Sequence, residues 1–204
     1  MAQTIVIVAL SLALAFAAFL HFGVPTLLHT HWGKLALLVG AVVLPVVTSA
    51  GSMAVGFHQS SRTVFCLTCH EMQNHGKSLF ADNPKSLVAA HYQNRLVDRD
   101  SICYSCHKDY AMFGDVKAKL NGLRHVYVHY LGSIPNKFAL YQPYPNSNCL
   151  HCHADARRFV EGQAHAGVMT KILSNQMSCL GCHNVAHDMK NVEAGNFWQA
   201  QYPQ

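Results

Sequence analysis

The chain has 204 residues, of which half are hydrophobic and only 12% are charged. A typical soluble domain carries about 25% charged residues, so part of this chain is expected to contact lipid. The formal net charge is +5, but Lys and Arg do not form the dense cluster that nucleic-acid binding requires. Nucleic acid is therefore excluded as a partner.

Two stretches near the N-terminus, residues 5–28 and 35–57, contain no Asp, Glu, Lys or Arg. Each is long enough to cross a hydrocarbon core of about 30 Å as a helix. A secretory signal peptide is the alternative for the first stretch, but that stretch lacks a basic start and is longer than a usual signal core. We expect residues 1–33 to hold an extra hydrophobic membrane helix and residues 34–57 to form the membrane anchor.

All eight cysteines lie beyond the anchor, in four Cys-x-x-Cys-His units. The spacing is typical of covalent attachment of c-type haem, in which two thiols bind the vinyl groups and the histidine binds the iron. A redox dithiol or a zinc site would not require a histidine after the second cysteine every time, and disulfides would leave the motifs empty. We expect four haem c groups, attached at Cys66, Cys69, Cys103, Cys106, Cys149, Cys152, Cys179 and Cys182, with His70, His107, His153 and His183 as the motif histidines.

The predicted haems also change the net charge of the protein and indicate on which side of the membrane the haem domain lies. Their propionates add roughly eight negative charges, so the loaded protein is near neutral or mildly acidic. Haem is attached to such motifs on the outer side of the energy-conserving membrane, and the first motif begins nine residues after Phe57. Lys34, at the start of the anchor, agrees with the positive-inside tendency. We expect residues 58–204 to be extracytoplasmic, on the periplasmic side of a bacterial inner membrane.

About 147 residues remain to enclose the four predicted haems. That is too little chain for an ordinary core around each haem, so the haems should form most of the interior. We predict a mainly α fold with short helices, long loops and little or no sheet. The Pro- and Asn-rich loop 132–148 is expected to divide the domain into two dihaem halves.

Further histidines are candidates for the second axial position of the irons. Apart from the four motif histidines, the extracytoplasmic part contains His58, His75, His91, His125, His129, His151, His165 and His187. From the residues alone, any one of them could be an axial ligand, a surface histidine or a propionate contact.

The order of motifs and spaced histidines resembles the NapC/NirT/NrfH family of membrane-anchored tetrahaem quinol dehydrogenases, over about residues 34–190. The similarity begins with the membrane helix that leads into Cys66-Leu-Thr-Cys69-His70-Glu71-Met72 and ends with Cys179-Leu-Gly-Cys182-His183-Asn184-Val185-Ala186-His187. Between them, the family's positions match Ser86, His91, Asn94, Arg95, Lys119, Tyr127, His129, Gly132, Lys137, Phe138, Asn146, Ser147, Asn148 and His165.

The resemblance implies roles for several of these residues. His91, His165 and His187 match positions used for distal ligation or kept close to the haems. Met72 matches a methionine that binds the first iron in one branch of the family, so the first iron takes either His70 or Met72. Simple packing is the alternative role for Met72.

The resemblance also implies a quinol site beside the first haem. Lys119 matches the family's lysine, but His125 stands where an acidic residue is expected. His125 could act as the base, could ligate the first iron, or could contact a propionate. Asp115, one helical turn before Lys119, is the nearest alternative acid.

Three functions follow. The first is a quinol dehydrogenase that oxidises menaquinol or ubiquinol and passes electrons to an extracytoplasmic reductase or soluble cytochrome. The second is an electron-transfer subunit without a quinol site, held in a larger complex when the extra helix packs against another integral membrane subunit. The third, a terminal reductase, is disfavoured because all four motifs are ordinary. We expect the first.

Overall fold

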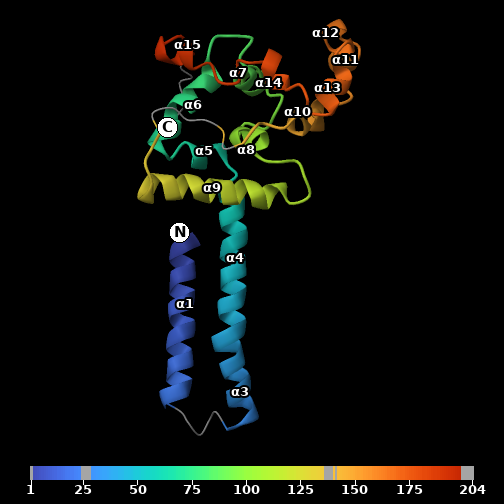
Figure 1. Ribbon diagram of the computed structural model, residues 1–204. Coiled ribbons are helices and arrows are strands. Elements are labelled where there is room, and N and C mark those ends of the chain that lie inside the picture. The colour runs from blue at the N-terminus through green and yellow to red at the C-terminus, as the bar shows by residue number, and fades with distance from the viewer. Residues whose placement is uncertain (1, 24–28, 136–139, 141, 199–204) are drawn as a thin grey trace. The chain divides into compact units, whose positions relative to one another are not determined.

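The computed structural model describes residues 2–23, 29–135, 140 and 142–198 (Figure 1). Within these residues the chain is mainly helical. The only β-type pairing is an isolated bridge between Ala81 and Phe197. The expectation of a mainly α fold with little or no sheet is confirmed. The chain forms two compact units, residues 1–60 and 61–204.

The first unit is a pair of apolar helices. Helix α1 spans Ala2–Ala18 and continues as the π-helical segment Phe19–Gly23. The second helix runs without a break through α3 (His31–Leu38), a π-helical segment (Val39–Val43) and α4 (Leu44–Gln59). The proline that follows the π-helical segment, Pro45, has no N–H to donate, which accounts for the wider turn just before it.

The second helix starts earlier than the predicted anchor. Thr30 caps it, because its Oγ1 accepts a hydrogen bond from the backbone N–H of Gly33 at 3.0 Å. The continuous helix His31–Gln59 has 29 residues and a mean hydropathy of 2.0 over its most apolar 18-residue window, so it is long and apolar enough to cross a membrane. Residues 24–28, which include Pro25 of the first predicted stretch, lie outside the described residues.

Small residues allow the two helices to pack closely. Ala13 of α1 and Leu20 of the π-helical segment that follows it are buried, as are Gly33 and Gly40 of the second helix. A Cβ at position 40 would lie 2.5 Å from Cδ1 of Phe16, so a larger residue there would force the Phe16 ring to move, and glycine allows the close approach. Most other large apolar side chains of the pair are exposed.

The second unit is built from short helices and one long one. They are α5 (Thr63–Cys66), α6 (Gln73–Lys77), α7 (Leu87–Gln93), α8 (Ile102–His107), α9 (Gly114–Leu131), α10 (Asn146–His153), α11 (Arg157–Val160), α12 (Gln163–Ala166), α13 (Met169–Leu173), α14 (Cys179–Cys182) and α15 (Met189–Glu193), with single 3₁₀ turns at His70–Met72 and Ser78–Phe80.

Its apolar core is small. The buried cluster consists of Leu79, Tyr92 and Ile102, with Phe80, Val88 and Cys103 packed around it. Many other large apolar side chains in this unit are exposed. A unit of this size normally buries far more apolar surface, so the protein part alone is not a sufficient core.

Candidate functional site: the four cysteine motifs and the Lys119 cluster

Each Cys-x-x-Cys-His motif begins on or at the end of a short helix. Cys66 ends α5, Cys103 lies in α8, Cys149 lies in α10 and Cys179 opens α14. All eight cysteines are free thiols, with no disulfide between them. The motifs therefore keep both sulfurs of each pair available for covalent attachment of haem.

The first two motifs are joined through Thr63, three residues before Cys66. The backbone N–H of Thr63 donates to the carbonyl of Asp100 at 2.6 Å, and its hydroxyl donates to the carbonyl of Arg99 at 2.9 Å. The thiols of Cys66 and Cys103 are hydrogen-bonded, and this bond together with burial raises the pKa of Cys66. The first cysteines of these two motifs therefore lie side by side.

The last two motifs are joined in the same way through Asn146, three residues before Cys149. The buried Asn146 side chain donates to the carbonyls of Ile172 and Met177 at 2.8 and 2.7 Å. Its Oδ1 accepts from the backbone N–H of Cys179 at 2.9 Å. Burial and the nearby Cys179 raise the pKa of Cys149 to about 11.

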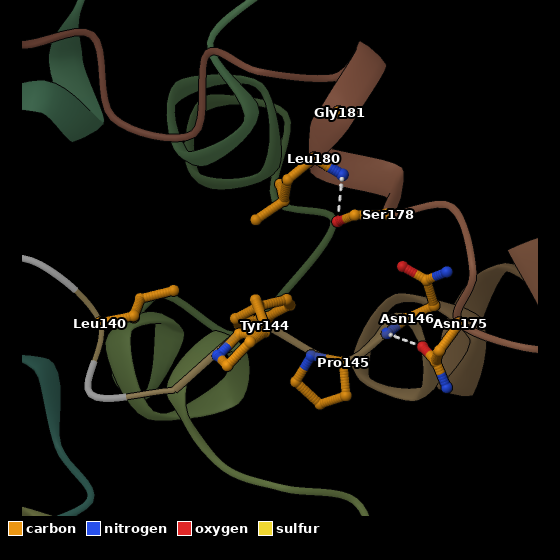
Figure 2. A pocket seen from close by; sticks show the side chains of 9 residues that line it. Leu140, Tyr144, Pro145, Asn146, Asn175, Ser178, Leu180 and Gly181 are labelled. Atoms are coloured by element: carbon orange, nitrogen blue, oxygen red, sulfur yellow. Dashed lines mark hydrogen bonds between the residues drawn. The ribbon is translucent and has the colours of Figure 1, made fainter.

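A pocket of about 550 Å³ opens beside this joint (Figure 2). Its wall includes Leu140, Tyr144 and the two residues between the cysteines of the fourth motif, Leu180 and Gly181. Figure 2 shows Leu140 and Tyr144 on one side and Leu180 on the other. A space of this kind, apolar and next to two cysteine motifs, suits part of a porphyrin.

Three motif histidines face a second histidine at one common spacing. Metal–imidazole bonds are about 2 Å long and the ring centre lies roughly 1 Å beyond the nitrogen, so two imidazoles on one iron have ring centres roughly 6 Å apart. The ring centres are 6.3 Å apart for His107 and His187, 5.9 Å for His153 and His91, and 6.4 Å for His183 and His165. These residues fit haem iron.

The second member of each pair is oriented through its Nδ1. His187 Nδ1 is 2.8 Å from Ser78 Oγ, His91 Nδ1 is 2.7 Å from the carbonyl of Leu87, and His165 Nδ1 is 3.1 Å from the carbonyl of Phe159. A metal-binding histidine is usually held in this way, with the other ring nitrogen facing the metal. Burial, with His75 and His107 nearby, lowers the pKa of His187 to about 4, so its ring is neutral, as ligation requires.

The first motif differs from the other three. The His70 and His129 ring centres are 6.2 Å apart, but a carboxylate oxygen bridges them. Glu71 Oε1 lies 3.2 Å from His70 Nε2 and 2.7 Å from His129 Nδ1. Its own backbone N–H and His129 lower the pKa of Glu71. The nitrogen of His70 that would bind iron is thus engaged by Glu71.

The other candidates for the first iron occupy distinct places. Met72 is half-buried at the end of the 3₁₀ turn that follows the motif. His125 lies on α9, six residues after Lys119, which places it about 120° away round the helix. Burial lowers the pKa of His125.

Lys119 and Asp115 meet through Tyr104, a residue that lies between the cysteines of the second motif. The Tyr104 hydroxyl donates to Asp115 Oδ1 at 2.9 Å, and Lys119 Nζ lies 4.1 Å from the centre of the Tyr104 ring. Lys119 Nζ also donates to Ser61 Oγ at 2.7 Å. Burial lowers the pKa of Lys119, whereas the Cys66 thiol and Asp115 act in the opposite direction. The lysine is therefore close to the first haem motif, in a cluster we call the Lys119 cluster: Ser61, Tyr104, Asp115 and Lys119.

Sequence reasoning assigned no role to Tyr104, Glu71 or His129. Tyr104 occupies a variable position of a motif, whereas Glu71 and His129 matched positions of the family without an assigned function. No spacing rule distinguishes them. Two other residues that carried the family resemblance, Lys137 and Phe138, lie outside the described residues.

Comparison with known proteins gives a consistent result. The chain is 26% identical to the cytochrome c-type protein NapC of Haemophilus influenzae over 160 residues, which cover 69% of this chain and 76% of NapC. It is also 26% identical to the cytochrome c-type protein TorC of Escherichia coli K12 over 182 residues, which cover 80% of this chain but only 44% of TorC.

Among solved structures, the chain is similar to a chain of the cytochrome c nitrite reductase NrfHA complex bound to the HQNO inhibitor, with a TM-score of 0.45 and 21% identity. That match covers 81% of this chain and 99% of the other. The model of the NapC/NirT cytochrome c family, N-terminal region, matches residues 28–192. The chain therefore belongs to the NapC/NirT family of membrane-anchored electron-transfer cytochromes, and haem c is its covalently bound cofactor.

Proposed function

We propose that this protein is a membrane-anchored quinol dehydrogenase that carries four haem c groups and delivers electrons to an extracytoplasmic reductase or a soluble cytochrome. The observation that carries the proposal is the Lys119 cluster, which lies close to Cys66 of the first motif. Haem c, when bound, supplies a one-electron acceptor. The remaining chemistry, which is to bind the quinol and take its protons, falls to side chains of this chain.

The Lys119 cluster contains the groups that quinol oxidation needs. The Lys119 ammonium has hydrogen atoms to donate to a quinol oxygen, and Asp115 is a carboxylate that can accept a proton. Tyr104 holds both, because its hydroxyl binds Asp115 and its ring lies under Lys119. The family relation supports this assignment, and menaquinol or ubiquinol is the substrate class. His125, on another side of α9, is assigned to the first iron instead of to proton transfer.

For the irons, we propose three bis-histidine sites and one that differs. The ring pairs His107 and His187, His153 and His91, and His183 and His165 have the spacing that a shared metal requires. For the first haem, Glu71 engages His70 Nε2, which favours Met72 as one axial ligand. His125, whose pKa is lowered by burial, is proposed separately as the other ligand. A thioether ligand raises the reduction potential relative to a second imidazole, as suits an entry point.

The proposal extends to orientation. Residues 58–204 would lie on the periplasmic side of the bacterial inner membrane and Lys34 on the cytoplasmic side; the four haem motifs support this orientation, because haem is attached to such motifs outside the cytoplasm. The alternative is an electron-transfer subunit that has no quinol site and sits in a larger membrane complex.

One experiment separates these functions. Purified holoprotein in detergent is mixed anaerobically with a menaquinol analogue, and haem reduction is followed by absorbance, with dithionite defining full reduction. A dehydrogenase is reduced by the quinol without any other protein. Haems that respond to dithionite but not to menaquinol or ubiquinol analogues would establish the alternative.

A further inference from the structure

Helix α9 has an apolar face that the second unit leaves uncovered. Six of its large apolar side chains fall along one side of the helix, whereas Val126, which is 52% exposed, lies on another side. Each of the six is between 48% and 76% exposed: Val116, Leu120, Leu123, Tyr127, Tyr130 and Leu131. Phe113 and Met112, just before the helix, are 73% and 90% exposed and extend the same surface. We call these eight residues the outer face of α9.

The opposite side of the helix faces the rest of the unit. Ala118, Gly122 and Val128 are half-buried there, and His129 on the same side binds Glu71. Figure 1 shows α9 as a single uninterrupted helix along one edge of the second unit. The outer face therefore lies on the side of α9 away from the contact between His129 and Glu71 of the first motif. A continuous apolar surface of this size marks an interaction site.

The chain connection indicates what covers this face. Lys119, in the middle of α9, donates a hydrogen bond to Ser61 at 2.7 Å. Ser61 follows Gln59, the last residue of the apolar helix His31–Gln59, by two positions. Two residues span at most about 7 Å. Lys119, in the middle of α9, thus binds a residue that lies only two positions along the chain from the end of a helix able to cross the membrane.

Charge and aromatic content agree with a lipid surface. Lys117 and Arg124 lie at one edge of the outer face, Lys119 lies at the other, and Asp115 is the single acid of the helix. Lys117 Nζ forms an ion pair with Asp109 Oδ2 at 2.9 Å. Interfacial helices combine such basic edges with an apolar face, and tyrosines such as Tyr127 and Tyr130 favour the headgroup level. A soluble reductase would not require this continuous apolar strip.

We propose that the outer face of α9 lies in the headgroup region of the membrane that His31–Gln59 crosses, parallel to the surface. The helix then fixes the Lys119 cluster at the depth where a lipid-soluble substrate arrives. The proposal does not depend on quinol oxidation: a pure electron carrier would use the same contact.

The test is a measurement of depth by spin labelling. In the holoprotein the native cysteines are bonded to haem, so an introduced cysteine is the reactive thiol. Leu123→Cys on the outer face and Leu173→Cys on α13, which is 58% exposed in the same unit, are labelled and placed in nanodiscs of phosphatidylcholine and phosphatidylglycerol. Collision rates with oxygen and with a water-soluble nickel chelate are then compared.

The label at position 123 should collide more with oxygen than with the chelate, and the label at position 173 should show the reverse. Tyr127→Cys provides a second outer-face position, and the haem absorbance of each variant reports folding. Equal, water-like accessibility at positions 123, 127 and 173 would overturn the proposal. Protection of positions 123 and 127 from both reagents would also overturn it, because a protein and not lipid would then cover the face.

Discussion

Tyr104 contacts both side chains that the resemblance and helix spacing suggested for proton and quinol chemistry. Its hydroxyl binds Asp115 and its ring supports Lys119. Burial, and then the bond to Asp115, raise the pKa of Tyr104 to about 12, so the hydroxyl remains a donor at neutral pH. We regard it as a positioning residue for the Lys119 cluster.

Tyr104→Phe keeps the ring under Lys119 but removes the bond to Asp115, whereas Tyr104→Leu removes both. A hydrogen bond to a charged group contributes about 1.5–3 kcal/mol when it is shielded and less when it is exposed. Quinol-driven haem reduction should therefore slow by about 3- to 10-fold in the phenylalanine variant and by more in the leucine variant. Equal rates of quinol-driven haem reduction in both variants and the wild type would show that Tyr104 does not position the Lys119 cluster.

The ligands of the first iron provide a second prediction at this scale. Met72→Ala should abolish the sulfur-to-iron charge-transfer absorption of the oxidised protein, because the thioether is proposed as an axial ligand. His129→Gln should leave that band unchanged, since His129 Nδ1 binds Glu71. The reverse pattern, with a change only in His129→Gln, would show that His70 and His129 share the first iron.

Some residues of the haem motifs and of the Lys119 cluster could be predicted from the sequence, and others could not. The motif cysteines and histidines follow from chemistry that requires a fixed spacing, and the structure brings His91, His165 and His187 opposite motif histidines. Glu71 and Tyr104 act through contacts between distant segments. Nothing in local spacing reports such contacts, so only the fold could identify them.

At the scale of elements, the two joints between neighbouring motifs have the same arrangement but are built from different residues. Thr63 and Asn146 each lie three residues before a motif cysteine and bind the chain before the next motif. The division at the proline-rich loop 132–148 stays a prediction, whereas the joints themselves depend on buried side chains. A threonine and an asparagine carry no shared sequence signal.

Asn146→Ala would leave the carbonyls of Ile172 and Met177 and the N–H of Cys179 without this partner. Each lost buried hydrogen bond costs about 1 kcal/mol, with a further cost for unsatisfied groups. The free energy of unfolding should fall by about 3 kcal/mol in a denaturant titration of the holoprotein. Asn74→Ala, at an exposed position on α6, is the control. If both variants unfold at the same denaturant concentration, Asn146 does not hold the joint.

At the scale of the whole molecule, the buried apolar residues are too few to stabilise the second unit. Its main buried cluster contains three residues, so the haems must supply most of the interior. This balance was predictable from about 147 residues and four motifs. The uncovered face of the long helix α9 was not predicted, because the sequence does not say which side of a helix remains outside.

Removal of one haem should therefore affect the entire second unit. The double substitution Cys179→Ala with Cys182→Ala should yield a protein that is degraded or protease-sensitive throughout residues 61–204, because the fourth haem is part of the interior. Lys171→Ala, on the neighbouring helix α13, should accumulate normally. A stable, protease-resistant protein with three haems would contradict the view that haem replaces the core.

Quinol oxidation at the Lys119 cluster is tested most directly by the rate of haem reduction by a menaquinol analogue in nanodiscs, measured by stopped flow for Lys119→Ala and for Lys117→Ala. Lys117 lies on the same helix but pairs with Asp109, which makes it a matched control. We predict at least a tenfold slower reduction in Lys119→Ala, a rate close to wild type in Lys117→Ala, and unchanged reduction of both by dithionite. Equal rates of haem reduction in the two variants would show that quinol is not oxidised at the Lys119 cluster.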